Sequence, residues 1–123
     1  MTKQPTLETI LIVDTDPLQR ALVGQYLRDC GHRVLEATNA EEALKVLESQ
    51  EVDVLVTHLA LRDASGFELS ARARETRPSV SVVLTHSPQR TAKVAADLCE
   101  DGPLDHPYHP QHLVDRIKRL RGS

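Results

Sequence analysis

The chain has 123 residues, which is enough for one domain with a buried core and too few for two. It is 40% hydrophobic and 27% charged, as is usual for a globular protein, and its net charge of -3 provides no basic field to attract nucleic acid. It has no apolar run of membrane-spanning length and no apolar signal segment, so we expect a cytoplasmic protein without membrane contact.

The N-terminal third predicts two strands on either side of a helix. Residues 1–9 are expected to be a flexible tail, and the continuous apolar run at residues 10–13 is typical of a strand buried on both faces. Asp16 followed by Pro17 predicts the start of a helix. Residues 33–38 are more mixed in character, which favours a strand at the edge of a sheet.

The same alternation continues through the middle of the chain. Asn39 is a capping residue that predicts the start of a second helix, and residues 52–56 predict a third strand. Ser65 opens a third predicted helix. The apolar residues 80–84 predict a fourth strand, and Ser87 opens the helix after it.

The C-terminal part predicts one more strand and one more helix. Residues 103–105 are short and contain a proline, which suits an edge strand, and Pro110 opens the last helix. Strand–helix alternation with short loops implies a parallel sheet covered by helices on both faces. We therefore predict an α/β domain over residues 10–121, a doubly wound (βα)5 sandwich of three layers with strand order 2-1-3-4-5.

In such a sheet, ligands bind in the crevice outside the carboxyl ends of the strands. The residues that follow these ends carry acids, hydroxyls and imidazoles: Asp14, Thr15, Asp16, His58, Thr85 and His106. No glycine-rich phosphate loop follows any strand, which argues against a nucleotide-dependent enzyme.

Five stretches together carry a family resemblance: ILIVDTDP, NAEEAL, DVLVTHLALRDASGFEL, VVLTHS and LDHPYHPQHL. From about Ile10 to Leu120, the chain resembles the receiver domains of bacterial two-component response regulators, which have a flavodoxin-like fold. The resemblance implies a switch in which an aspartate after the third strand accepts phosphate from a histidine kinase. It also implies two Mg²⁺-binding acids after the first strand, a Thr or Ser after the fourth, and a Lys after the fifth.

Matched position by position, the chain departs from this pattern. Asp14 matches the first acid and Thr85 the hydroxyl residue, but Thr15 stands where the second acid is expected. His58 occupies the phosphoacceptor position, and His106 stands in place of the lysine. Because Mg²⁺ requires hard oxygen ligands, the loss of two carboxylates predicts weak or absent Mg²⁺ binding and no resident cofactor.

The altered site leaves several hypotheses open. The domain can be a degenerate receiver that acts by protein contact, or a pH-responsive site in which His58 and His106 gain protons near Asp14. The same three side chains can serve as Zn²⁺ ligands, or His58 itself can accept phosphate. A small metal-assisted hydrolase is the rival enzyme class, although no nucleophile stands beside a base.

We predict the first of these: a receiver in two-component or phosphorelay signalling that is not an enzyme and has no catalytic residue. The expected partners are a histidine kinase or a fused or cognate effector domain, with a homodimer through the 88–121 face and no contact with nucleic acid. Pro103 occupies the position of the family's switch aromatic, and a proline cannot change rotamer. Binding through that face is therefore expected to be constitutive.

Two further predictions concern the cysteines and one histidine. Cys30 and Cys99 lack metal-binding or redox-motif spacing and are predicted to be free buried thiols. His32 lies in the turn after the first helix and is predicted to be a surface residue.

Overall fold

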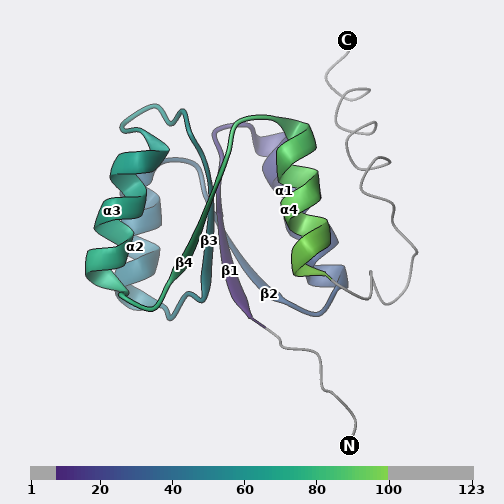
Figure 1. Ribbon diagram of the computed structural model, residues 1–123, viewed down its shortest axis with the longest axis horizontal. Coiled ribbons are helices and arrows are strands. Elements are labelled where there is room, and N and C mark those ends of the chain that lie inside the picture. The colour runs from purple at the N-terminus through teal and green to yellow at the C-terminus, as the bar shows by residue number, and fades with distance from the viewer. Residues whose placement is uncertain (1–7, 100–123) are drawn as a thin grey trace, which may run out of the picture.

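Figure 1 shows the computed structural model, in which residues 8–99 are described. One parallel sheet contains, in this part of the chain, β1 (Thr9–Val13), β2 (Arg33–Ala37), β3 (Val54–His58) and β4 (Ser81–Thr85). The helices are α1 (Pro17–Asp29), α2 (Ala40–Ser49), α3 (Gly66–Thr76) and α4 (Pro88–Leu98). None of these helices is both long and apolar enough to cross a membrane.

The strand order is β2-β1-β3-β4, which confirms the first four positions of the predicted order. The predicted fifth strand, residues 103–105, lies outside the described residues. β2 occupies an edge of the sheet as predicted. β1 begins at Thr9, so the last residue of the predicted tail belongs to the sheet.

Each helix begins at the capping side chain that the sequence predicts. Asp16 accepts hydrogen bonds from two backbone N–H groups in the first turn of α1, at 3.0 and 3.3 Å. Asn39, Ser65 and Ser87 each accept from the N–H group three residues further on. Such caps satisfy donors that lack a partner inside the helix, and each contributes about 1 kcal/mol.

The helices form a layer on each face of the sheet (Figure 1), with α2 and α3 on one side and α1 and α4 on the other. Alternate residues of β1 supply the two cores: Ile10 and Ile12 pack under α1 and α4, and Leu11 and Val13 under α2 and α3. The predicted three-layer arrangement is therefore confirmed for the part of the chain that the structure describes.

α4 lies beside α1, on the face of the sheet away from α3. Its buried residues have small side chains, among them Ala92, Val94 and Ala95, and they join the core that α1 covers. The right-handed crossover rule decides the face of a helix only when a parallel strand of the same sheet follows it. α4 packs against α1, and the strand predicted to follow it, residues 103–105, lies outside the described residues.

A disulfide joins Cys30 to Cys99, so the prediction of two free thiols is wrong. The two residues are the C-terminal caps of α1 and α4, and their Cα atoms are 5.8 Å apart. They are separated by 69 positions in the sequence, and no local pattern signals the pair. Only the packing of α4 beside α1 brings the two sulfur atoms together.

His32 is buried, and the prediction of a surface residue is also wrong. Its Nδ1 accepts the backbone N–H of Glu8 at 3.2 Å, and its Nε2 lies 2.6 Å from the carbonyl oxygen of Leu98. Since Nδ1 accepts, Nε2 carries the proton of the neutral ring and donates to Leu98. His32 thus connects the start of the sheet to the end of α4.

Candidate functional site at the strand ends

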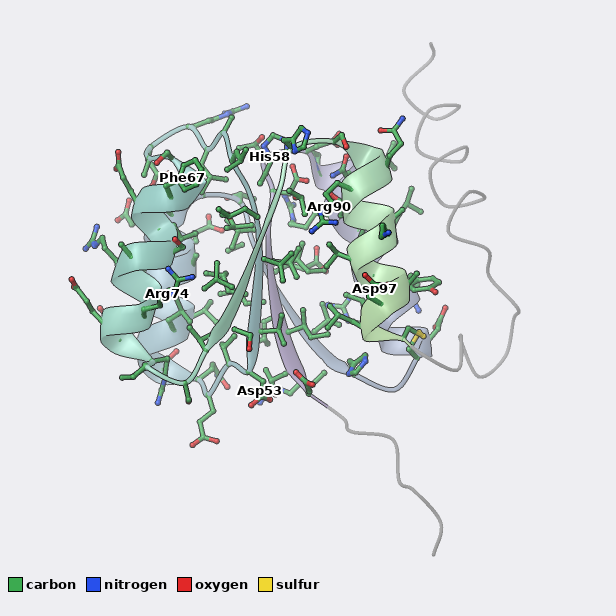
Figure 2. The ribbon with its side chains drawn as sticks, viewed as in Figure 1. Asp53, His58, Phe67, Arg74, Arg90 and Asp97 are labelled. Atoms are coloured by element: carbon green, nitrogen blue, oxygen red, sulfur yellow. A yellow bond between two sulfur atoms is a disulfide. The ribbon has the colours of Figure 1, made fainter. Side chains whose placement is uncertain are left out.

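The predicted site residues gather at the edge of the sheet where the parallel strands end. Asp14 follows β1 directly, and His58 and Thr85 are the last residues of β3 and β4. Figure 2 shows His58 at this edge, with Asp53 at the opposite one. His106 and Pro103 lie outside the described residues.

Asp14 is a buried carboxylate, 6% exposed, and each of its oxygens accepts a hydrogen bond within the chain. Oδ1 accepts the backbone N–H of Asp16 at 2.9 Å, and Oδ2 accepts the side-chain amide of Gln19 at 2.9 Å. The carbonyl oxygen of Asp14 accepts from Arg20 Nη1 at 2.6 Å. A cation at this carboxylate would have to share its oxygens with these donors.

Thr15 and Asp16 complete the loop after β1. Thr15 is half-buried and carries no charge into the loop. Asp16 uses its side chain as the N-terminal cap of α1, as the sequence predicts. Asp14 is therefore the buried acid of this loop in the described structure.

Buried hydrogen bonds connect Asp14 to the first turn of α4. The amide nitrogen of Gln19 also donates to Thr91 Oγ1 at 3.3 Å, and that hydroxyl donates to the carbonyl oxygen of Ser87 at 3.1 Å. A primary amide has two N–H donors and can serve both partners. Sequence reasoning missed this link. Gln19 lies on the same helical face as the buried Val23, and a polar residue on a buried face indicates a hydrogen-bond partner in the interior.

The imidazole of His58 is bound to its own loop. Its Nδ1 accepts the backbone N–H of Ala60 at 3.1 Å, so Nε2 carries the proton of the neutral ring. His58 is paired with Thr85 across the two strands, and the N–H of Leu59 extends the pairing to the carbonyl oxygen of Thr85 at 2.9 Å. Thr85 itself is buried, at 1% exposed, whereas His58 is half-buried.

Asp63 attaches the loop after β3 to the start of α2. Its two carboxylate oxygens accept the backbone N–H groups of Ala40 and Glu41, each at 2.9 Å. These two hydrogen bonds hold the pKa of the Asp63 carboxyl below its ordinary value. Sequence reasoning gave Asp63 no such role, because its partners are more than twenty positions away.

A metal centre is not assembled by the described residues alone. Within residues 8–99, no group of three or more His, Cys, Asp or Glu side chains is arranged to hold a metal ion. The three-ligand set of Asp14, His58 and His106 includes one residue beyond this range and remains a prediction.

The sequence profile of the response regulator receiver domain matches residues 10–118. Among curated relatives, an uncharacterised 14.6 kDa protein of Leptolyngbya boryana is 46% identical over 115 residues, which cover 89% of this chain and 87% of that protein. A sensor kinase/phosphatase for autoinducer 1 of Vibrio harveyi is 37% identical over 75 residues, covering 61% of this chain and 9% of the kinase. A cyclic di-GMP phosphodiesterase of Thermotoga maritima is 33% identical over 111 residues, covering 89% of this chain and 30% of the enzyme. The chain thus spans only a small part of these two longer relatives.

Solved structures agree with the sequence match. A CheY-like receiver domain protein from Methanospirillum hungatei superposes with a TM-score of 0.63 at 26% identity, covering 94% of each chain. A BeF3-activated DrrB receiver domain has a TM-score of 0.60 at 26% identity, covering 96% of this chain and all of the other. With the parallel sheet, the strand order and the profile match in agreement, the chain belongs to the response regulator receiver domain family.

Proposed function

We propose that this receiver domain signals through protein contacts. The resemblance implies an aspartate that accepts a phosphoryl group, and we propose that this domain does not use such a reaction. The observation that carries the proposal is the position of His58 at the end of β3, where the resemblance places the phosphoacceptor. An imidazole that accepts the N–H of Ala60 supplies no carboxylate oxygen to a metal or to phosphate.

The loop after β1 supports the same proposal. Both oxygens of Asp14 already accept hydrogen bonds, Thr15 has no charge, and Asp16 caps α1. Mg²⁺ is dehydrated reluctantly and binds through carboxylates in octahedral geometry. We infer weak or absent Mg²⁺ binding and no resident cofactor.

An exposed aromatic beside the strand ends suits a protein partner. Phe67 is 63% exposed and is the large hydrophobic residue that stands out on the surface of residues 8–99. It lies in the first turn of α3, at the same end of the molecule as His58 (Figure 2). We propose that this edge contacts a cytoplasmic histidine kinase or a fused or cognate effector domain.

A homodimer through the 88–121 face remains a second contact that we propose. The part of this face that α4 forms is polar, because its exposed residues are Gln89, Arg90, Lys93 and Asp97. A second copy would meet hydrogen-bonding and charged groups on α4, and no large apolar patch there.

The first test is the intact mass of the chain after incubation with a small-molecule phosphodonor and Mg²⁺. We expect no mass gain for the wild type and none for His58→Asn, which matches the size of an aspartate but lacks its charge. His58→Asp restores a carboxylate and is the positive comparison for the remaining site. A gain of one phosphoryl group by the wild type would overturn the proposal.

A second candidate function, a pH-responsive loop, is favoured by one hydrogen bond. A protonated imidazole has no acceptor nitrogen, so protonation of His58 breaks its bond with the N–H of Ala60. We expect the amide resonance of Ala60 to move when the wild type is mildly acidified, and to stay in place in His58→Asn. An Ala60 resonance that does not move on acidification of the wild type rejects this function.

A further inference from the structure

We propose that Cys30 and Cys99 form a reversible thiol–disulfide site. In the oxidised chain it holds the C-terminal end of α4 on α1, and in the reduced chain it releases that end. The proposal is independent of the proposed function, since its chemistry uses neither His58 nor Asp14 and its test uses no phosphodonor.

The backbone positions suit a bond that can form and break without rearrangement of the helices. The Cα atoms of Cys30 and Cys99 are 5.8 Å apart, inside the range of roughly 4.4 to 6.8 Å that disulfides require. Both residues follow the last turn of their helices. Gly31, at φ 99°, turns the chain away immediately after Cys30. The pair therefore lies at two helix ends and not in the middle of a helix.

Exposure decides which sulfur a reagent meets first. Cys99 is buried, at 7% exposed, whereas Cys30 is half-buried in the turn after α1. Thiol–disulfide exchange requires a thiolate to approach one sulfur directly. We expect that attack to occur at Cys30.

The reaction balances with a low-molecular-weight thiol such as glutathione. Its thiolate attacks Cys30 Sγ, the disulfide breaks, and Cys99 Sγ leaves with the electron pair and takes up a proton. A second thiolate attacks the sulfur of the small molecule in the mixed disulfide, which releases Cys30 as a thiolate and forms the small-molecule disulfide. Oxidation is the reverse, with two protein thiols converted to one disulfide as the small-molecule disulfide becomes two thiols.

We expect α4 to depend on this cross-link because most of its core-facing side chains are small. The buried side chains Ala92, Val94 and Ala95 remove little apolar area from water compared with leucine or phenylalanine. At the end of the helix, Leu98 is only partly buried against the core, and His32 donates a hydrogen bond to its carbonyl oxygen. Figure 2 shows the disulfide at the end of α4 that lies away from His58.

The first turn of α4 has a separate attachment. Thr91 accepts from Gln19 on α1 and donates to the carbonyl oxygen of Ser87. Reduction leaves these bonds in place. The reduced helix should therefore loosen from its C-terminal end and stay attached near Thr91.

The first test is a redox titration of the full chain with glutathione at several ratios of thiol to disulfide. Each sample is treated with an alkylating reagent, and its intact mass is measured. We expect an intramolecular disulfide, two hydrogen atoms lighter and unalkylated, that converts to a dithiol as the thiol fraction rises. A chain that stays unalkylated at every ratio, or that yields only glutathione adducts or covalent dimers, overturns the proposal.

The second test is amide hydrogen exchange in the oxidised and the reduced chain. We expect reduction to speed exchange at residues 94–98 on the order of tenfold, with a smaller change near Thr91 and none in β1. Cys99→Ser and Cys30→Ser should reproduce the reduced pattern under oxidising conditions, and Ser49→Ala on α2 is a control away from the bond. Equal exchange of residues 94–98 in the two redox states overturns the release of α4.

Discussion

Asp63 shows how a single exposed carboxylate can organise a loop. Its side chain lies outside α2 and accepts two N–H groups of that helix's first turn, where the helix also presents the positive end of its dipole. The cap from Asn39 satisfies a third N–H group of the same turn. Asp63 therefore attaches the loop that follows His58 to a helix start that is already well capped.

The charge of Asp63 predicts a pH dependence of stability. Because its pKa is lowered on folding, its contribution is complete above the ordinary value of about 3.9 and is lost as the pH falls through the lower folded value. Asp63→Asn should lower the urea midpoint at neutral pH, and the difference from the wild type should shrink in acid below about pH 4.

The control for this measurement is Asp97→Asn, on the exposed face of α4. It should leave the midpoint close to the wild-type value at every pH. A constant difference between Asp63→Asn and the wild type, from neutral pH into acid, would show that the charge of Asp63 is not what stabilises the loop.

At the start of α3, the backbone of Gly66 lies close to the backbone at the end of β3. A Cβ atom added to Gly66 would lie 2.6 Å from the carbonyl oxygen of His58 and 3.1 Å from the Cα atom of Leu59. The N–H of Gly66 donates to the carbonyl oxygen of Leu59 at 2.7 Å, which keeps the two segments together. Glycine is required here because the backbone of the strand end leaves no room for a side chain.

Two glycine substitutions should therefore act in opposite directions. Gly66→Ala should cost about 1–3 kcal/mol, because the obstructing atoms belong to backbone and cannot swing aside. Gly24→Ala meets only the ends of the Arg28 and Glu36 side chains, at 3.3 Å, and should gain about 0.5–1 kcal/mol of helix stability. Urea unfolding of both variants checks this, and two changes of the same sign would contradict it.

At the scale of the whole molecule, the disulfide joins the end of α1 to the end of α4. It links residues 69 positions apart, so it removes many conformations from the unfolded chain. Its two cysteines end the helices that cover one face of the sheet. Stability of that layer is therefore shared between the apolar core and one covalent bond.

Reduction should lower the free energy of unfolding by about 3–5 kcal/mol, as expected for a cross-link that closes a loop of this length. Urea unfolding with and without a reducing agent measures the difference. The Cys30→Ser, Cys99→Ser double variant should match the reduced wild type and should not respond to the reducing agent. If reduction leaves the wild-type urea midpoint unchanged, the disulfide does not contribute this free energy of unfolding.

Local features of this fold could be read from the sequence with good accuracy. The helix starts at Asp16, Asn39, Ser65 and Ser87 depend on side chains within three residues of the groups they bind. The strands follow apolar runs, with ends that shift by one or two residues, as at β3, which continues to His58. That Asp14, His58 and Thr85 lie at one edge of the sheet could also be predicted, because parallel strands bring their carboxyl ends together.

Long-range pairs could not be read in the same way. His32 has partners at Glu8 and Leu98, and Asp63 has partners on α2, with no periodicity or spacing to signal either set. The cysteines were misjudged for the same reason, since their spacing matches no motif.

The sequence by itself determined the order of the elements, their caps, the two-faced apolar pattern of the sheet and the histidine at the end of β3. These depend on contacts between near neighbours and on the chemistry of single side chains. Tertiary structure alone decided that α4 lies beside α1, that Cys30 meets Cys99, and that Gln19 connects Asp14 to Thr91. Such contacts exist only after distant segments pack, because the burial of apolar surface, which chooses among packings, is a property of the assembled core.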